Sequence, residues 1–170
     1  GPQQPGAAPS RLWTHVSLEV LEAAELIGAD LGGDCDPYCV IQALPLSTAP
    51  ECSTSVAKHT TQPKWNEVFD IEIDPRTTQG IVMTVLDRDA VGEDNFIGMQ
   101  TFRCDSALWM TPEGEGWFPL VAREQYDVDQ NILHRRDRCA LGSIRLRWKF
   151  TKHVAGKGGA SEPPATLDSA

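Results

Sequence analysis

The sequence lacks several features that define other classes of protein. No apolar run approaches the roughly 18 residues of a membrane-spanning helix, and no basic start followed by an apolar core suggests a signal peptide. The five cysteines are an odd number without a Cys-x-x-Cys pair, which argues against a disulfide framework and a structural zinc site. We therefore expect reduced thiols and a cytoplasmic protein.

Basic charge and catalytic motifs are also scarce. The chain has 15 Lys and Arg against 24 Asp and Glu, a net charge of -9. Nonspecific nucleic-acid binding depends on cationic contacts to phosphates, so we expect no nucleic-acid partner. The four histidines are isolated in the sequence, and no Gly-x-Ser-x-Gly turn accompanies the Ser and Thr residues near 53–61. The sequence therefore predicts a protein that is not an enzyme.

The composition predicts one folded domain between two tails. A chain of 170 residues with 41% hydrophobic residues can bury one core. Residues 1–10 and 153–170 are rich in Gly, Pro, Ala and Ser and lack an apolar pattern. We expect flexible tails there, a domain over 11–152, and a monomer.

Alternation of apolar and polar residues predicts an all-β fold. It recurs in residues 16–20, 69–73 and 144–150, and five further short runs (38–44, 53–60, 80–86, 97–102 and 116–120) end in Gly, Pro, Asp or Asn. Short strands separated by turn residues favour an eight-stranded antiparallel β-sandwich over a parallel α/β sheet. A short helical turn capped by Asp105 is expected before Pro112.

Two acidic loops predict a metal site. Asp87 and Asp89 end one apolar run, and Asp30 and Asp36 precede another. Calcium takes six to eight oxygen ligands in flexible geometry, which carboxylates from two loops can supply together. The alternative is that these residues only form good turns. An EF-hand is rejected for 87–98, because Val91 stands at an acidic position and Gly98 replaces the bidentate Glu.

Four groups of residues occur in an order that resembles the C2 domain family. They are Leu26-Ile27-Gly28-Ala29-Asp30 with Asp36-Pro37-Tyr38, then Pro63-Lys64-Trp65-Asn66-Glu67-Val68-Phe69, then Asp87-Arg88-Asp89 with Phe96-Ile97-Gly98, and finally Trp117-Phe118-Pro119-Leu120 with Gly142-Ser143-Ile144-Arg145-Leu146. The resemblance covers residues 12–151. It implies a Greek-key sandwich of eight strands in the family's second circular arrangement, with calcium held between loops at one end.

The resemblance also implies particular ligands. Asp30, Asp36, Asp87 and Asp89 match four acidic positions, and the fifth falls on Asn95, which brings no negative charge. Asp94 is the adjacent acid and the alternative ligand. We therefore expect Ca²⁺ binding that is weakened or reduced in ion number.

Membrane recruitment follows from the same resemblance. Calcium at an acidic tip cancels its repulsion from anionic phospholipid of the phosphatidylserine class. Leu31 and Val91 lie beside candidate ligands, and we expect them to insert into the membrane. The chain is thus predicted to be a targeting module of a larger cytosolic protein that becomes peripheral on a calcium rise. The alternative is a calcium-insensitive module that binds a protein partner through the basic strand or the 121–141 loop. Arg145, Arg147 and Lys149 on that strand form a possible surface for lipid or a partner.

Overall fold

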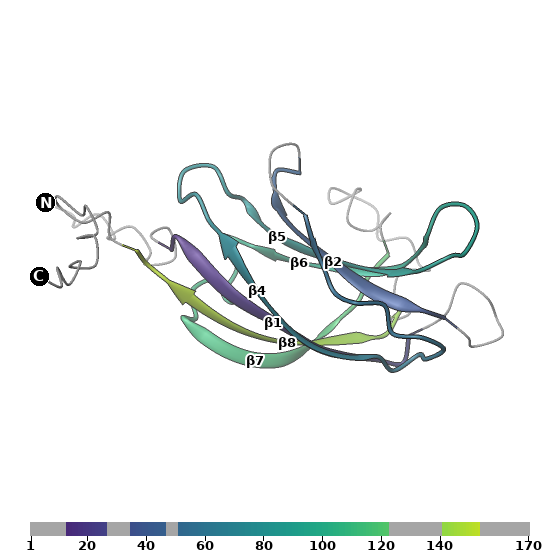
Figure 1. Cartoon of the computed structure of the whole chain (residues 1–170). Coiled ribbons are helices and arrows are strands. Elements are labelled where there is room, and N and C mark those ends of the chain that lie inside the picture. The colour runs from purple at the N-terminus through teal and green to yellow at the C-terminus, as the bar shows by residue number, and fades with distance from the viewer. Residues whose placement is uncertain (1–12, 27–34, 47–50, 123–140, 154–170) are drawn as a thin grey trace, which may run out of the picture.

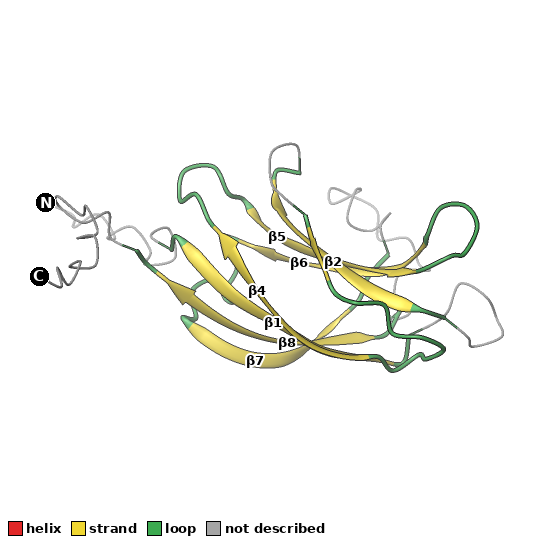
Figure 2. Ribbon diagram, in the orientation of Figure 1, coloured by secondary structure: helices red, strands yellow, loops and turns green. Residues whose placement is uncertain are grey.

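The computed structural model describes residues 13–26, 35–46, 51–122 and 141–153. These residues form two antiparallel sheets of four strands each and contain no helix (Figures 1 and 2). The strands are β1 (His15–Ala24), β2 (Pro37–Leu44), β3 (Cys52–Ser53), β4 (Lys64–Glu72), β5 (Gly80–Asp87), β6 (Asn95–Arg103), β7 (Glu113–Pro119) and β8 (Ser143–Thr151). The predicted eight-stranded sandwich is confirmed. Apart from His153, the expected tails lie outside the described residues.

The two sheets have the strand orders β4-β1-β8-β7 and β3-β2-β5-β6. The strand predicted over residues 144–150 is β8, which lies between β1 and β7. His15 at the start of β1 pairs with Thr151 at the end of β8, so the first and last strands of the domain are neighbours.

Alternation in the sequence places the core between the sheets. Leu18 on β1 and Leu146 on β8 are almost completely buried, whereas Glu19 and Arg147 face outward on the same strands. Fully burying such a side chain stabilises the fold by about 1.5–3 kcal/mol. The period of two therefore fixes which face of each strand is covered.

One expected strand is mostly irregular. The prediction of a strand over 53–60 was wrong after Ser53, because the following segment bonds to the start of β2 at every third residue. The backbone N–H groups of Thr54, Ala57 and Thr60 donate to carbonyls of residues 39, 37 and 35. A ladder needs bonds at a spacing of two, so β-branched residues alone did not produce a strand here.

A short turn forms after Asp105 as predicted, but the Asp105 side chain has a different partner from the predicted one. The N–H groups of Trp109, Met110 and Thr111 each bond three residues back, and these turns do not continue into a helix. The Asp105 carboxylate lies 3.5 Å from the Arg103 Nε instead of capping a helix.

The acidic strand ends meet at one end of the sandwich. The 88–94 loop between β5 and β6 and the 54–63 loop before β4 lie together there (Figure 1). Pro37 at the start of β2 pairs with Asp87 at the end of β5. The fold thereby brings residues that are distant in sequence to one tip.

Candidate functional site

Asp36 and Asp87 are joined directly at this tip. The Asp36 backbone N–H donates to Asp87 Oδ1 at 2.8 Å, and the Arg88 N–H donates to the Asp36 carbonyl at 3.0 Å. Asp87 is only 8% exposed. Strand pairing therefore holds two of the predicted ligands together across 51 residues of sequence.

Three candidate carboxylates keep an oxygen available. Asp36 Oδ1 accepts the His59 N–H at 2.8 Å, and Asp89 Oδ1 accepts the Val91 N–H at 3.5 Å. Within the described part of the chain, no hydrogen bond reaches Oδ2 of Asp36, Asp87 or Asp89. Carboxylate oxygens of this kind are the ligands that calcium prefers.

Asn95 occupies the position opposite Asp87. The two residues are partners in the β5–β6 register, and Asn95 is exposed. An irregularity between Val85 and Leu86 sets this register at the end of the hairpin. Asn95 thus lies opposite Asp87 in the sheet and offers an uncharged amide oxygen as a candidate ligand.

Asp94 is committed to other contacts. Its Oδ2 accepts the Tyr38 hydroxyl and lies 3.4 Å from the Arg88 Nε, and its Oδ1 accepts the Asp89 N–H at 2.9 Å. The hydrogen bond from Tyr38, followed by that from Asp89, lowers the pKa of Asp94. Burial and the bond to Asp94 raise the pKa of Tyr38. Both oxygens of Asp94 therefore have partners.

Three further residues were predicted to lie at the tip, namely Asp30, Leu31 and Val91. Val91 is 84% exposed at the 88–94 loop, whereas Asp30 and Leu31 lie outside the described residues. Across residues 13–26, 35–46, 51–122 and 141–153, no group of three or more His, Cys, Asp or Glu side chains is close enough to hold a metal ion. The described candidate ligands all offer oxygen atoms, which fits a hard cation.

The basic residues of β8 are largely neutralised. Arg145 pairs with Glu22 at 3.1 Å and with Glu115, and Arg147 pairs with Glu19 at 2.7 Å and with Glu115 at 3.4 Å. The bond and charge of Glu19 raise the pKa of Arg147 further. The alternation of β8 predicted its outward face, but the glutamate partners on β1 and β7 required knowledge of the strand order.

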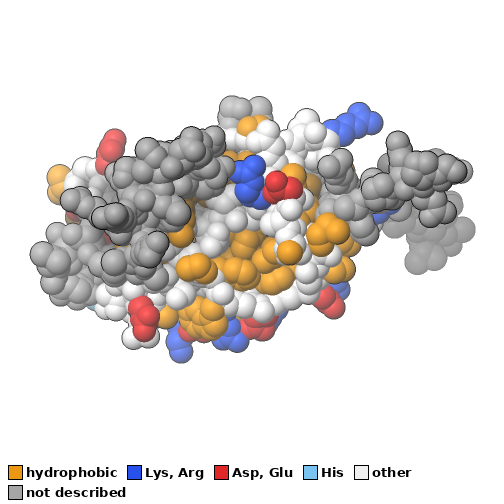
Figure 3. Space-filling view, turned by 180° about the vertical axis from the view of Figure 1, so that it is seen from behind, with side chains coloured by type: hydrophobic (Ala, Val, Ile, Leu, Met, Phe, Trp, Pro, Cys, Tyr) orange, Lys and Arg blue, Asp and Glu red, His pale blue; other side chains and the backbone are white. Residues whose placement is uncertain are grey.

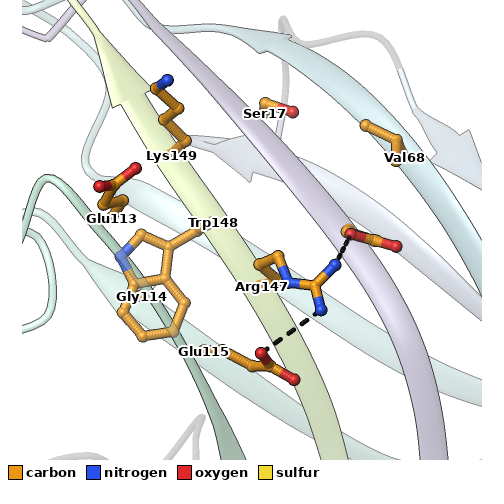
Figure 4. A pocket seen from close by; sticks show the side chains of 9 residues that line it. Ser17, Val68, Glu113, Gly114, Glu115, Arg147, Trp148 and Lys149 are labelled. Atoms are coloured by element: carbon orange, nitrogen blue, oxygen red, sulfur yellow. Dashed lines mark hydrogen bonds and ion pairs between the residues drawn. The ribbon is translucent and has the colours of Figure 1, made fainter.

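A groove follows the outward face of the β4-β1-β8-β7 sheet. It has a volume of about 470 Å³ and is lined by residues of all four strands, with Ser17 on β1 and the Trp148 ring packed against Gly114 on the other side (Figure 4). Val68 at one side is 57% exposed, and Lys149 and Glu113 lie at the other. Figure 3 shows the molecule from behind, where hydrophobic side chains gather centrally and basic side chains lie near acidic ones.

Two histidines that are isolated in the sequence meet in the structure. The rings of His15 and His153 lie 4.2 Å apart, and the Thr14 hydroxyl is 2.9 Å from His15 Nδ1. The pairing of β1 with β8 brings them together, which the sequence spacing could not indicate. Among the described residues this pair lacks a third metal-binding neighbour.

Comparison with known proteins identifies the family. The family model described as "C2 domain" matches residues 14–120. The chain belongs to the C2 domain family. C2 domains are modules that target proteins to membranes or lipids and are not themselves catalytic. Among the residues that the structure describes, no candidate membrane-spanning helix is found.

Known proteins with similar sequences and solved structures with a similar fold are consistent with membership of this family. Over 142 residues, this C2 domain is 30% identical to Ras GTPase-activating protein 4B of Homo sapiens, covering 84% of the chain and 16% of the relative. The chain thus spans about a sixth of that relative's length. A C2 domain of plant Extended Synaptotagmin 1 has a TM-score of 0.62 at 21% identity, covering 83% of this chain and 96% of that one. The calcium-bound pair of C2 domains from Extended-Synaptotagmin 2 gives 0.60 at 19% identity, covering 82% and 46%.

Proposed function

We propose that this C2 domain binds calcium at its acidic tip and then binds anionic phospholipid membranes, as the targeting module of a larger protein. The ligands are Asp30, Asp36, Asp87 and Asp89, with Asn95 as an uncharged fifth donor. The observation that carries the proposal is the joining of Asp36 and Asp87 at two paired strand ends, each with an oxygen left over. A structural relative whose C2 domains were solved with calcium bound supports calcium as the ion.

The chemistry of the tip favours calcium over softer metals. Its described donors are carboxylate and amide oxygens, without a thiolate, and such a set suits calcium or magnesium. Ligands carried by separate loops tolerate the irregular geometry that calcium accepts and magnesium does not. Bound calcium supplies positive charge and open coordination positions for lipid phosphates and carboxylates.

Membrane binding follows from charge cancellation and apolar insertion. Without calcium, the carboxylates repel the negative cytoplasmic leaflet, and calcium removes that repulsion. Val91 is almost fully exposed beside Asp89, and its burial in the acyl boundary adds about 1.5 kcal/mol. Leu31 is proposed to do the same from the first loop. The protein would then be a cytoplasmic monomer that becomes peripheral when calcium rises.

A calcium titration by calorimetry tests the first step, and cosedimentation with phosphatidylserine vesicles tests the second. We expect calcium binding in the micromolar to millimolar range, and vesicle binding only with calcium. Vesicles of phosphatidylcholine alone are the matched control, because they present no net negative charge. Absence of calcium binding at several millimolar contradicts the proposal.

A second candidate function is protein docking on the outward sheet face, independent of calcium. The groove and the exposed Val68 favour it, and Trp117 on the same face is 47% exposed. Because Arg145 and Arg147 are each paired with glutamates, this face suits a protein surface better than an anionic membrane. Binding of a protein partner that persists without calcium and is lost in the Val68→Asp variant would favour this alternative.

A further inference from the structure

Arg88 lies in the middle of the proposed calcium ligands. It is the one basic residue between Asp87 and Asn95, and its backbone N–H is bonded to the Asp36 carbonyl. An arginine side chain that turned toward these carboxylates would compete with calcium, because both cations seek the same oxygens. The position of the guanidinium therefore matters for affinity.

The Arg88 guanidinium is paired with Asp94, which is not one of the proposed ligands. The Arg88 Nε lies 3.4 Å from Asp94 Oδ2, and its Cζ lies 4.7 Å from the centre of the Tyr38 ring. The Tyr38 hydroxyl donates to that same Asp94 oxygen, and the Asp89 N–H donates to the other. One carboxylate thus ties Arg88, strand β2 and the backbone of a proposed ligand into one arrangement.

We propose that Tyr38 and Asp94 hold the Arg88 guanidinium away from the calcium ligands, so that Asp94 is a positioning residue and not a ligand. This inference rests on the proposed calcium-binding function and names the residues that set the affinity of that site. The charge of Asp94 is balanced by Arg88, and its two oxygens are already used by Tyr38 and Asp89. Asn95, one residue later, pairs with Asp87 in the strand register and remains the proposed fifth ligand.

The test separates positioning from ligation by a double-mutant cycle. Calcium affinity is measured by calorimetry for wild type, Asp94→Asn, Arg88→Gln and the double variant. Freeing the arginine in Asp94→Asn should weaken affinity by about two- to fivefold, as expected for one partly exposed ion pair. Adding Arg88→Gln should restore it, because the competing cation is then gone. Glu93→Gln, which removes an exposed charge from the same loop, measures the general effect of net charge.

A second measurement does not depend on calcium. The Arg88 Nε–H is followed by ¹⁵N NMR in calcium-free protein, where a held guanidinium exchanges slowly with water. We expect protection in wild type and faster exchange in Asp94→Asn and Tyr38→Phe. Tyr38→Phe keeps the ring under Arg88 but removes the hydroxyl, so its calcium affinity should fall less than that of Asp94→Asn.

Each outcome bears on one proposal. If Asp94→Asn weakens calcium binding equally with and without Arg88→Gln, then Asp94 is itself a ligand and the inference is wrong. If Asp94→Asn matches Glu93→Gln and the Arg88 signal is unprotected, the inference also fails while calcium binding stands. If wild type binds no calcium, the proposed function fails, and with it any role of Arg88 at such a site.

Discussion

Replacing Asp87 and Asp89 with Asn removes two charges from the tip with little change of shape. The Asn side-chain oxygen at position 87 can still accept the Asp36 N–H that Asp87 accepts at 2.8 Å. Relief of repulsion among neighbouring carboxylates favours the calcium-free fold. We therefore expect the double variant to fold, with a melting temperature in chelator equal to or above that of wild type.

The size of the calcium response can be worked out from ligand linkage. Calcium at a hundred times its dissociation constant stabilises the native state by about 2.7 kcal/mol. For a domain of this size, each 1 kcal/mol raises the melting temperature by about 3–5 °C. Wild type should therefore melt about 10 °C higher with calcium, whereas the double variant should barely respond.

Differential scanning fluorimetry with calcium and with chelator measures this response. The matched control is Asp70→Asn with Glu72→Gln, which removes two exposed acids from β4 and changes the net charge equally. The control should keep the full response. An equal calcium-induced rise in the Asp87→Asn, Asp89→Asn variant would refute the assignment, because stabilisation by a ligand requires its site.

Three further predictions concern other positions. Leu31→Ala with Val91→Ala should weaken vesicle cosedimentation at saturating calcium while sparing calcium affinity without lipid, and unchanged cosedimentation would argue against insertion. Asn95→Asp should raise calcium affinity in calorimetry and lower the melting temperature in chelator, since it adds a like charge opposite Asp87; no change in either would contradict ligation at that position. Burial raises the pKa of the Cys39 thiol, so iodoacetamide at pH 8 should modify the half-buried Cys52 well before Cys39 in mass spectrometry, and equal rates would contradict the burial.

The sandwich was predictable because alternation is a local signal. Each of Val16, Leu18 and Val20 is buried as its pattern required. The segment after Ser53 was not predictable in this way, because the Thr54 hydroxyl accepts the Cys39 N–H and replaces part of the ladder. Whether a β-branched residue continues a strand depends on such a partner, and the sequence does not show it.

The candidate site was predictable in its residue types but not in its geometry. The acids at 87, 89, 94 and 36 all lie near the tip, but choosing between Asp94 and Asn95 requires the β5–β6 register. That register depends on the irregularity between Val85 and Leu86. The partners of Arg145 and Arg147 were likewise hidden, because Glu19 is 128 residues from Arg147 in the chain. Both cases depend on which strands pair and in which register, and neither composition nor residue spacing determines that pairing.

The response to calcium depends on charge at the tip and not on the net charge of -9. The glutamates on the outward sheet face are paired with Arg145 and Arg147, so their charges are largely neutralised there. In the proposed ligand set, Asp30, Asp36, Asp87 and Asp89 carry four negative charges, while Arg88 and Asp94 cancel each other. Two calcium ions bring four positive charges and cancel the set. An acid at position 95 would leave one charge over, so in the proposed site we expect Asn95 to lower the affinity for each ion while two ions would still remove the repulsion from an anionic membrane.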